Sequence, residues 1–265
     1  FEIRGKNLEI IGGFETCSSQ EPDGVSRLEN AGGTSTVLDL YDQGSSGGEW
    51  TVRLENIEIT GGNEDTQFLR GGGLNVEDKY WVVLTDVEIF ENRTTATGGG
   101  VQINGDLDTA LFVLGESIID NNAADRGGCI GCIGAGPADQ PVVIIDRGAI
   151  AANSAANGGG IAAEACTVGS YAGGFFRGIF NNTATGNGGG IQATDGSQIG
   201  VFGTAPGLFV DGMPDVAAFL GGNTADGRGG GVWVGSDASF EAVDALIVAN
   251  SADRGGGAYV DGGES

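Results

Sequence analysis

The sequence predicts an all-β fold, a right-handed parallel β-helix of about nine coils with three short strands in each coil. Three observations indicate this solenoid. A motif of asparagine followed by glycines recurs along the chain, short β-type runs fill the intervals, and 53 of the 265 residues are glycine. Because glycine inside a helix costs about 1 kcal/mol relative to alanine, this composition excludes long helices.

The glycine motif occurs seven times, and its spacing sets the size of one coil. Its third residue falls at positions 73, 100, 129, 160, 190, 231 and 257, so successive copies are 27, 29, 31, 30, 41 and 26 residues apart. Three short strands and three turns use about this length at ~3.3 Å per strand residue. Coils that stack ~4.8 Å apart give a rod on the order of 40 Å long, so we expect residues 1–265 to form a single domain.

Short apolar runs supply the expected strands in chain order. Several alternate apolar and polar residues, as half-buried strands do; these runs are LEIIGG, STVLDLY, EWTVRLENIEIT, YWVVLTDVEIF, ALFVLGESII, PVVIID and VWV. The residue after each glycine motif should point inward and form one apolar stack, namely Leu74, Val101, Ile130, Ile161, Ile191, Val232 and Ala258. Two positions on, a second stack is expected from Val76, Ile103, Cys132, Ala163, Ala193, Val234 and Val260.

A column of asparagines precedes the glycines. Asparagine tolerates left-handed backbone, and stacked amides can hydrogen-bond from coil to coil as a ladder. The predicted ladder consists of Asn92, Asn121, Asn153, Asn182, Asn223 and Asn250. We interpret this column as structural rather than catalytic.

The paired elements GG(G/A)(I/L/V) and hydrophobic-x-x-Asn resemble the repeats of polymorphic membrane proteins and related autotransporter-type adhesins. IFENRTTATGGGV at 89–101 and FLGGNTADGRGGGV at 219–232 carry the resemblance, which extends from about residue 57 onward. The opening LEIIGGF also looks like the start of secreted β-helix proteins with the pectin-lyase-like fold. The resemblance implies a right-handed β-helix, export to the cell surface, and adhesion or scaffolding.

The charge of the chain favours some partners and excludes others. The formal net charge is −24, with two lysines and no histidine. Such a charge repels the phosphates of nucleic acid and anionic membranes, so neither is an expected partner. Carboxylates also suit calcium, but no calcium-binding motif is present, and no metal or other cofactor is predicted. The chain has no stretch of 18 apolar residues, so no membrane insertion is expected, and an extracellular or cell-surface location is predicted.

The four cysteines are Cys17, Cys129, Cys132 and Cys166. GGCIGC is a C-x-x-C motif, but the chain has no histidine and no second such motif, which disfavours zinc. Residues three apart in a strand lie ~10 Å from each other, too far for one disulfide. Cys166 belongs to the following coil, so a bridge from one of the pair to Cys166 is expected, with Cys132 as the preferred partner.

An enzyme is the main alternative function, because many β-helix proteins act on polysaccharides. Pectin hydrolases need clustered aspartates, and lyases need a base with calcium held by acids. The chain has no adjacent pair of aspartates, and its available bases are arginines. Four of them directly precede a glycine motif, namely Arg70, Arg126, Arg228 and Arg254. This column could bind carboxylates, or form local ion pairs such as Asp125–Arg126 and Asp253–Arg254, which is the reading we favour.

Two excursions from the repeat are the expected binding region. They lie near residues 167–178 and 195–222, and insertions in a solenoid protrude on one face. The ligand-binding candidates on or beside them are Tyr171, Phe175, Phe176, Phe209 and Arg228. The exposed pair Tyr80 and Trp81 is an additional candidate.

The sequence therefore predicts a non-enzymatic adhesin or structural scaffold at the cell surface, with a polysaccharide or another surface protein as partner. The alternatives are a polysaccharide lyase or glycoside hydrolase, and a filament subunit that associates end to end through exposed sheet edges.

Overall fold

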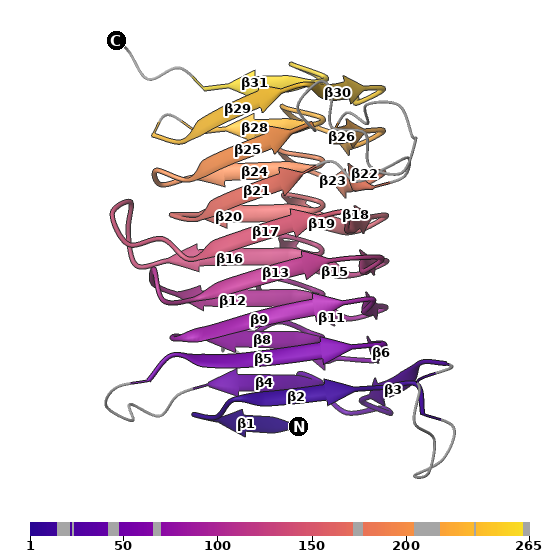
Figure 1. Cartoon of the computed structure of the whole chain (residues 1–265). Helices are drawn as coiled ribbons and strands as arrows, with labels where there is room; N and C mark the ends of the chain where they lie inside the picture. The colour runs from indigo at the N-terminus through magenta and orange to yellow at the C-terminus, as the bar shows by residue number, and fades with distance from the viewer. Residues whose placement is uncertain are drawn as a thin grey trace, which may run out of the picture.

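The computed structural model describes residues 1–14, 22, 24–41, 48–65, 70–171, 177–203, 218–235 and 237–261. These residues form a parallel β-solenoid whose coils stack from the N-terminus at one end to the C-terminus at the other (Figure 1). All strand pairs between neighbouring coils are parallel, and the described residues contain no helix. The predicted fold class, an all-β parallel solenoid, is confirmed.

The strands stack into four sheets, which we call A to D. Sheet A has nine strands: β1 (Glu2–Arg4), β4 (Leu38–Tyr41), β8 (Leu74–Glu77), β12 (Val101–Gly105), β16 (Ile130–Gly134), β20 (Ile161–Glu164), β24 (Ile191–Thr194), β28 (Val232–Val234) and β31 (Ala258–Val260). Sheet B has eight: β2 (Leu8–Ile11), β5 (Trp50–Glu55), β9 (Tyr80–Thr85), β13 (Ala110–Leu114), β17 (Val142–Asp146), β21 (Thr167–Tyr171), β25 (Gln198–Phe202) and β29 (Ser239–Val243).

The other two sheets complete each coil. Sheet C has eight strands: β3 (Ser26–Glu29), β6 (Ile57–Thr60), β10 (Glu88–Phe90), β14 (Ile118–Asp120), β18 (Ala149–Ala151), β22 (Gly178–Phe180), β26 (Ala218–Gly221) and β30 (Ala245–Val248). Sheet D has six: β7 (Asn63–Glu64), β11 (Arg93–Thr94), β15 (Ala123–Arg126), β19 (Ser154–Asn157), β23 (Thr183–Ala184) and β27 (Thr224–Ala225).

Two details of the coil differ from the sequence expectation. The middle coils have four strands rather than three, because the turn between the asparagine and the glycines also pairs from coil to coil as sheet D. The expectation of about nine coils is slightly high, because only sheet A has nine described strands, sheets B and C have eight and sheet D has six.

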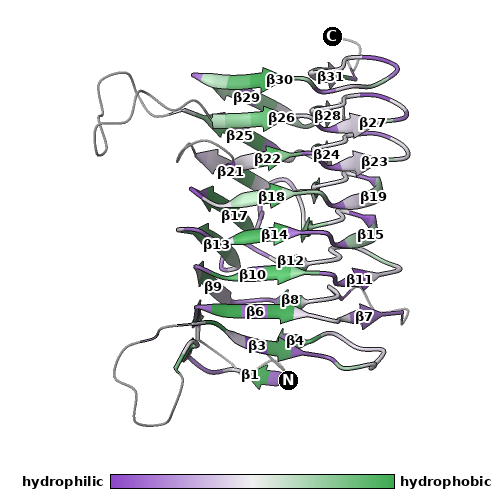
Figure 2. Ribbon diagram, turned by 90° about the vertical axis from the view of Figure 1, so that its right-hand side faces the viewer, coloured by the Kyte–Doolittle hydropathy of each residue, from purple (hydrophilic) through white to green (hydrophobic). Residues whose placement is uncertain are grey.

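The core is the set of inward side chains of sheets A, B and C. Val101 pairs in register with Leu74 and Ile130, and Ile103 with Val76 and Cys132, so the register of both predicted apolar stacks is confirmed. Their last members, Ala258 and Val260, are exposed on the last described strand. Strand residues alternate between the two faces of a sheet, and in sheet B every second side chain is buried. In sheet A the outward side chains Asn75 and Gln102 are buried as well. Hydrophobic residues lie along the stacked strands of sheet C, and hydrophilic residues lie at the turns and on sheet D strands such as β7 and β11 (Figure 2).

A ladder of buried asparagine amides joins the coils at the turn after sheet C. In each rung the side-chain Nδ2 donates to Oδ1 of the next asparagine at 3.0–3.2 Å, through Asn92, Asn122, Asn153, Asn182, Asn223 and Asn250. The backbone N–H of each donor residue reaches the same Oδ1 at 2.9–3.0 Å. The ladder thereby satisfies polar groups that the turn would otherwise bury without partners.

One predicted rung was wrong. Asn122 occupies the ladder, whereas the predicted Asn121 is exposed, and its Nδ2 donates to Asp120 at 2.8 Å. Asn121 has a φ of 51°, and Ala152 and Ala249 each show 54° after sheet C strands. Position 121 is therefore the left-handed corner residue, and the buried amide follows it.

The glycine motif allows the chain to pass close to the next coil. The first glycine is left-handed in several coils, for example Gly158 with a φ of 62°. At the second position, a Cβ on Gly159 would lie 2.5 Å from the backbone oxygens of Gly189 and Thr183. No larger residue fits there without moving the adjacent coil.

The structure contains a disulfide between Cys132 and Cys166, with the Cα atoms 6.0 Å apart, and a buried free thiol at Cys129. The bond joins residues 34 positions apart in neighbouring coils. Closing a loop of this size reduces the entropy of the unfolded chain, which stabilises the fold by about 3–4 kcal/mol. Cys17 lies outside the described residues.

Replacing Asn122 by alanine should lower the free energy of unfolding by about 2–4 kcal/mol, because it leaves the Asn92 N–H buried without its partner and removes the Nδ2 bonds to Asn153 and to the carbonyl of Ile89. The matched control is Asn121→Ala. Alanine already occupies the equivalent left-handed corners at Ala152 and Ala249, so this substitution should cost less than about 1 kcal/mol. Equilibrium urea unfolding measures both. Similar losses for the two neighbours would show that the ladder does not stabilise the coil.

Gly159→Ala should destabilise the protein by about 1–3 kcal/mol, since its Cβ meets backbone atoms that have no room to move. Gly136→Ala is the control, because a Cβ there has no heavy atom within 4 Å. Thermal unfolding of the two variants should differ clearly. A Gly159 variant as stable as the Gly136 variant would contradict the tight turn.

Candidate functional site

The outer face of sheet B presents an apolar strip that runs across five neighbouring strands, from β9 to β25. In register, Val83 lies beside Phe112, Phe112 beside Ile144, and Ile144 beside Gly169 and then Gly200. The strip comprises Trp81, Val83, Phe112, Ile144, Tyr171 and Phe202, of which Trp81 and Tyr171 are each 41% exposed.

The strip arises because these strands are apolar on both faces. Val82 and Leu84 point into the core and are fully buried, so Trp81 and Val83 between them point outward. Strands that face water normally carry polar residues there, so outward apolar side chains on an acidic protein mark a surface of interest. The runs YWVVLT and ALFVL carried this signal, but sequence reasoning missed Val83, Phe112, Ile144 and Phe202.

Two glycines let aromatic rings lie over the sheet at the C-terminal part of the strip. A Cβ on Gly169 would lie 2.9 Å from Cε2 of Tyr171, and a Cβ on Gly200 would meet the ring of Phe202. Each ring therefore covers the glycine two positions earlier on its own strand. A larger residue at either position would lift the ring away from the backbone.

Two aromatic pairs lie in the strip. Tyr171 and Phe202 are register partners whose ring centroids are 5.5 Å apart, with planes 27° apart. Trp81 and Phe112, on β9 and β13, have centroids 6.1 Å apart and planes 46° apart. These four rings present large apolar surface beside each other on a supporting sheet.

The predicted binding residues have different outcomes. Tyr171 lies in the strip, whereas Phe175, Phe176 and Phe209 lie outside the described residues. Tyr171 and Phe202 lie within the two ranges expected as excursions, where they end strands β21 and β25, and the structure places them on adjacent strands. The expectation for the additional pair was half right, because Trp81 is exposed but Tyr80 is buried, with its hydroxyl donating to the carbonyl of Ile3 at 3.2 Å.

Arg228 does not join Tyr171. Its side chain lies on the sheet A side, with Nη1 3.6 Å from Asp261 and the guanidinium 5.0 Å above the ring of Tyr259. Of the four arginines, Arg228 and Arg254 are neighbours, joined by a backbone β-bridge between adjacent coils, whereas Arg126 pairs with Thr97 and Asn157.

The ion pairs of the arginine column differ from those expected. Arg70 pairs with Asp39 at 3.0 Å and Arg126 with Glu164 at 2.7 Å, so the partners are carboxylates of sheet A rather than the preceding aspartates. The Arg126–Glu164 pair is partly exposed and contributes little to stability, whereas Asp39 is buried beside Arg70. Both pairs occupy arginines that a ligand would need.

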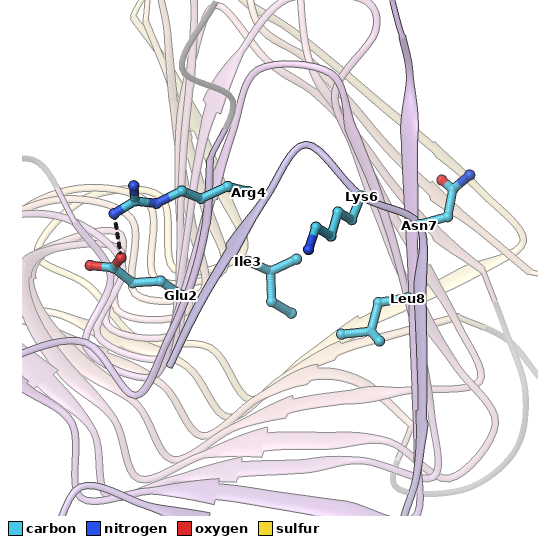
Figure 3. A pocket seen from close by; sticks show the side chains of 6 residues that line it. All are labelled: Glu2, Ile3, Arg4, Lys6, Asn7 and Leu8. Atoms are coloured by element: carbon cyan, nitrogen blue, oxygen red, sulfur yellow. Dashed lines mark hydrogen bonds and ion pairs between the residues drawn. The ribbon is translucent and has the colours of Figure 1, made fainter. Parts of the chain in front are cut away.

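A pocket of about 410 Å³ opens at the N-terminal end of the solenoid (Figure 3). It is lined by Glu2, Ile3, Arg4, Lys6, Asn7 and Leu8, from the outermost strands β1 and β2 and the turn between them. Lys6 points across it toward Ile3, while Arg4 pairs with Glu2. Ile3 and Leu8 occupy core columns of the first coil, so this pocket is the open end of the core.

Within the described ranges, no group of three or more acidic or cysteine side chains is arranged to hold a metal ion. Over the same residues, no helix is long and apolar enough to span a membrane.

Asp120 is the carboxyl group with the most perturbed environment. It lies on the outer face of sheet C, where burial, and then Glu88 and Glu91, raise its pKa to about 6. Its Oδ1 is buried without a hydrogen-bond partner, while Asn121 donates to Oδ2. A carboxyl of this kind can act as a general acid, but it lies on a different sheet from the aromatic strip.

Comparisons with known proteins found no relative: no family model, no curated protein and no solved structure matches the chain. The β-solenoid fold therefore rests on the register described above, and the resemblance to surface adhesins rests on the repeat motif alone.

Asp120→Asn should stabilise the protein at pH 7.5 and have little effect at pH 3.5. The pKa is about 6 in the fold against 3.8 in the unfolded chain, so the folded state binds more protons between these values. Stability at this site is consequently lost as pH rises from about 4 to 6. Melting temperatures at the two pH values measure the effect, and equal shifts at both would contradict the raised pKa.

Proposed function

We propose that this protein is a non-catalytic adhesin or scaffold of a cell surface, in which the solenoid displays a ligand-binding face on the outside of sheet B. The single observation that carries this proposal is the aromatic strip. Rings exposed on a rigid sheet, rather than on a loop, lose little conformational freedom when a ligand binds.

The repeat motif supports a surface location. The elements that resemble adhesin repeats correspond to structural positions, namely the ladder asparagine, the tight glycine turn and the first inward residue of sheet A. A regular solenoid of this kind serves to hold a binding face at a distance from its attachment. The disulfide agrees with an oxidising compartment outside the cell.

The enzyme alternative has weaker support. Glycoside hydrolysis uses two carboxyl groups with separate roles beside the bound sugar. The pKa of Asp120 is raised, as that of a general acid would be, first by burial and then by Glu88 and Glu91. However, Asp120 lies on sheet C, away from the aromatic strip on sheet B. The strip carries rings and aliphatic side chains without such a pair.

The filament alternative rests on the exposed apolar ends, where Phe1 is 71% and Val260 62% exposed. We favour binding through the side of the rod, because the aromatic pairs of the strip lie there.

The proposal is tested with immobilised polysaccharides and extracellular proteins, with and without calcium, while binding and release of reducing ends are read in the same wells. We expect a bound ligand and no product. Binding should be lost in the double variant Trp81→Ser, Tyr171→Ser and kept in Leu107→Ser, which removes an apolar residue that is 59% exposed in a turn. Product release, or binding that the double variant leaves unchanged, would contradict the proposal.

A further inference from the structure

The ligand class follows from the size, charge and shape of the strip, and this inference rests on the function proposed above. Five adjacent strands at ~4.8 Å span about 19 Å along the rod, and the strip is one to two side chains wide. Its area is on the order of 300 Å², well below the ~800 Å² that each partner buries in a stable protein complex. A flat protein partner, including a second copy, would gain too little contact here.

The surroundings of the strip disfavour an anionic ligand. None of its six side chains is charged; Asp146 and Glu241 lie at its border, beside Tyr171 and Gly200 in register, and Arg53 of β5 lies beside Val83 at the other end. With a net charge of −24 for the whole chain, an anionic polymer would be repelled. Aromatic faces also attract cations, but the six strip residues include no carboxylate, so a cationic group there would pair only with Asp146 and Glu241 at the border.

The rings suit the flat faces of sugars. A pyranose presents C–H groups on its faces and hydroxyl groups at its rim, and aromatic faces attract the partly positive hydrogens of C–H groups. Polar side chains border the strip, with Thr85 in register with Leu114 on one side and Gln198 in register with Thr167 on the other. The rings can thus pack on sugar faces while the border groups meet the hydroxyls.

The direction of the strip gives the orientation of the ligand. One aromatic pair lies on β9 and β13, and the other on β21 and β25, with Ile144 of β17 between them. A chain that contacts both pairs must cross the strands and therefore run parallel to the axis of the solenoid. We propose that the outer face of sheet B binds a linear, uncharged polysaccharide lying along the rod, with the two aromatic pairs as its anchor points.

The test uses isothermal titration of the whole protein with cellohexaose, xylohexaose, mannohexaose and chitohexaose, and with hexagalacturonate as the anionic counterpart. At least one uncharged hexamer should bind about ten-fold more tightly than hexagalacturonate and than its own disaccharide, which reaches a single aromatic pair. Trp81→Ser and Tyr171→Ser should each weaken the hexamer about ten-fold, and Leu107→Ser should not. Unchanged melting temperatures exclude a folding defect.

The contrary outcomes are distinguishable. Preference for hexagalacturonate, no binding of any uncharged hexamer, or equal affinity for disaccharide and hexamer would overturn the ligand class. If the strip variants then abolish binding of an extracellular protein, or convert a dimer to a monomer in sedimentation, the strip is a binding face with another occupant. If they alter no binding event at all, the proposed function fails as well.

Discussion

The buried amide ladder is the constraint on which the rest of the structure depends. A parallel solenoid has to turn its backbone at the same place in every coil, and a buried turn without hydrogen-bond partners would cost more than its packing returns. The asparagine amides solve this by accepting from one coil and donating to the next, as Asn153 does toward Asn182. With the turns fixed at a common level, the strands of every coil come into register.

That register brings the outward apolar residues of sheet B together into one continuous surface. Because β9 to β25 stack without a shift, outward side chains far apart in sequence form one line. Gly169 and Gly200 then allow the rings of Tyr171 and Phe202 to lie over the sheet. The asparagine ladder fixes the positions of the sheet B strands that form this face. A ligand therefore meets a surface that needs little reorganisation.

The solenoid and its core could be predicted from the sequence, because the spacing of the glycines and apolar residues shows which positions stack. The prediction failed where two neighbouring residues fitted the same local pattern. Asn121 and Asn122 are adjacent, and only the backbone conformation decides which one is buried. Sheet D escaped notice because strands such as Thr183–Ala184 are too short to show alternation.

The candidate site was predictable in part. Tyr171 was predicted because it lies within the expected excursion near 167–178, whereas Phe112 and Ile144 belong to runs that were interpreted as core strands. Tyr80 and Trp81 alternate inward and outward, and which of them faces solvent depends on the register of the strand with β5. Pairing between coils, rather than local composition, decides which residues become surface.

Hydrogen exchange measured by NMR tests the central role of the ladder most directly. The backbone amides of Asn122, Asn153 and Asn182 lie in turns, yet each donates to a buried Oδ1. The account predicts that they exchange as slowly as the core amides of Val101 or Ile161, which pair between strands. Exchange at the rate of exposed turn amides would show that the ladder opens independently, and that the coils are held in register by the apolar stacks alone.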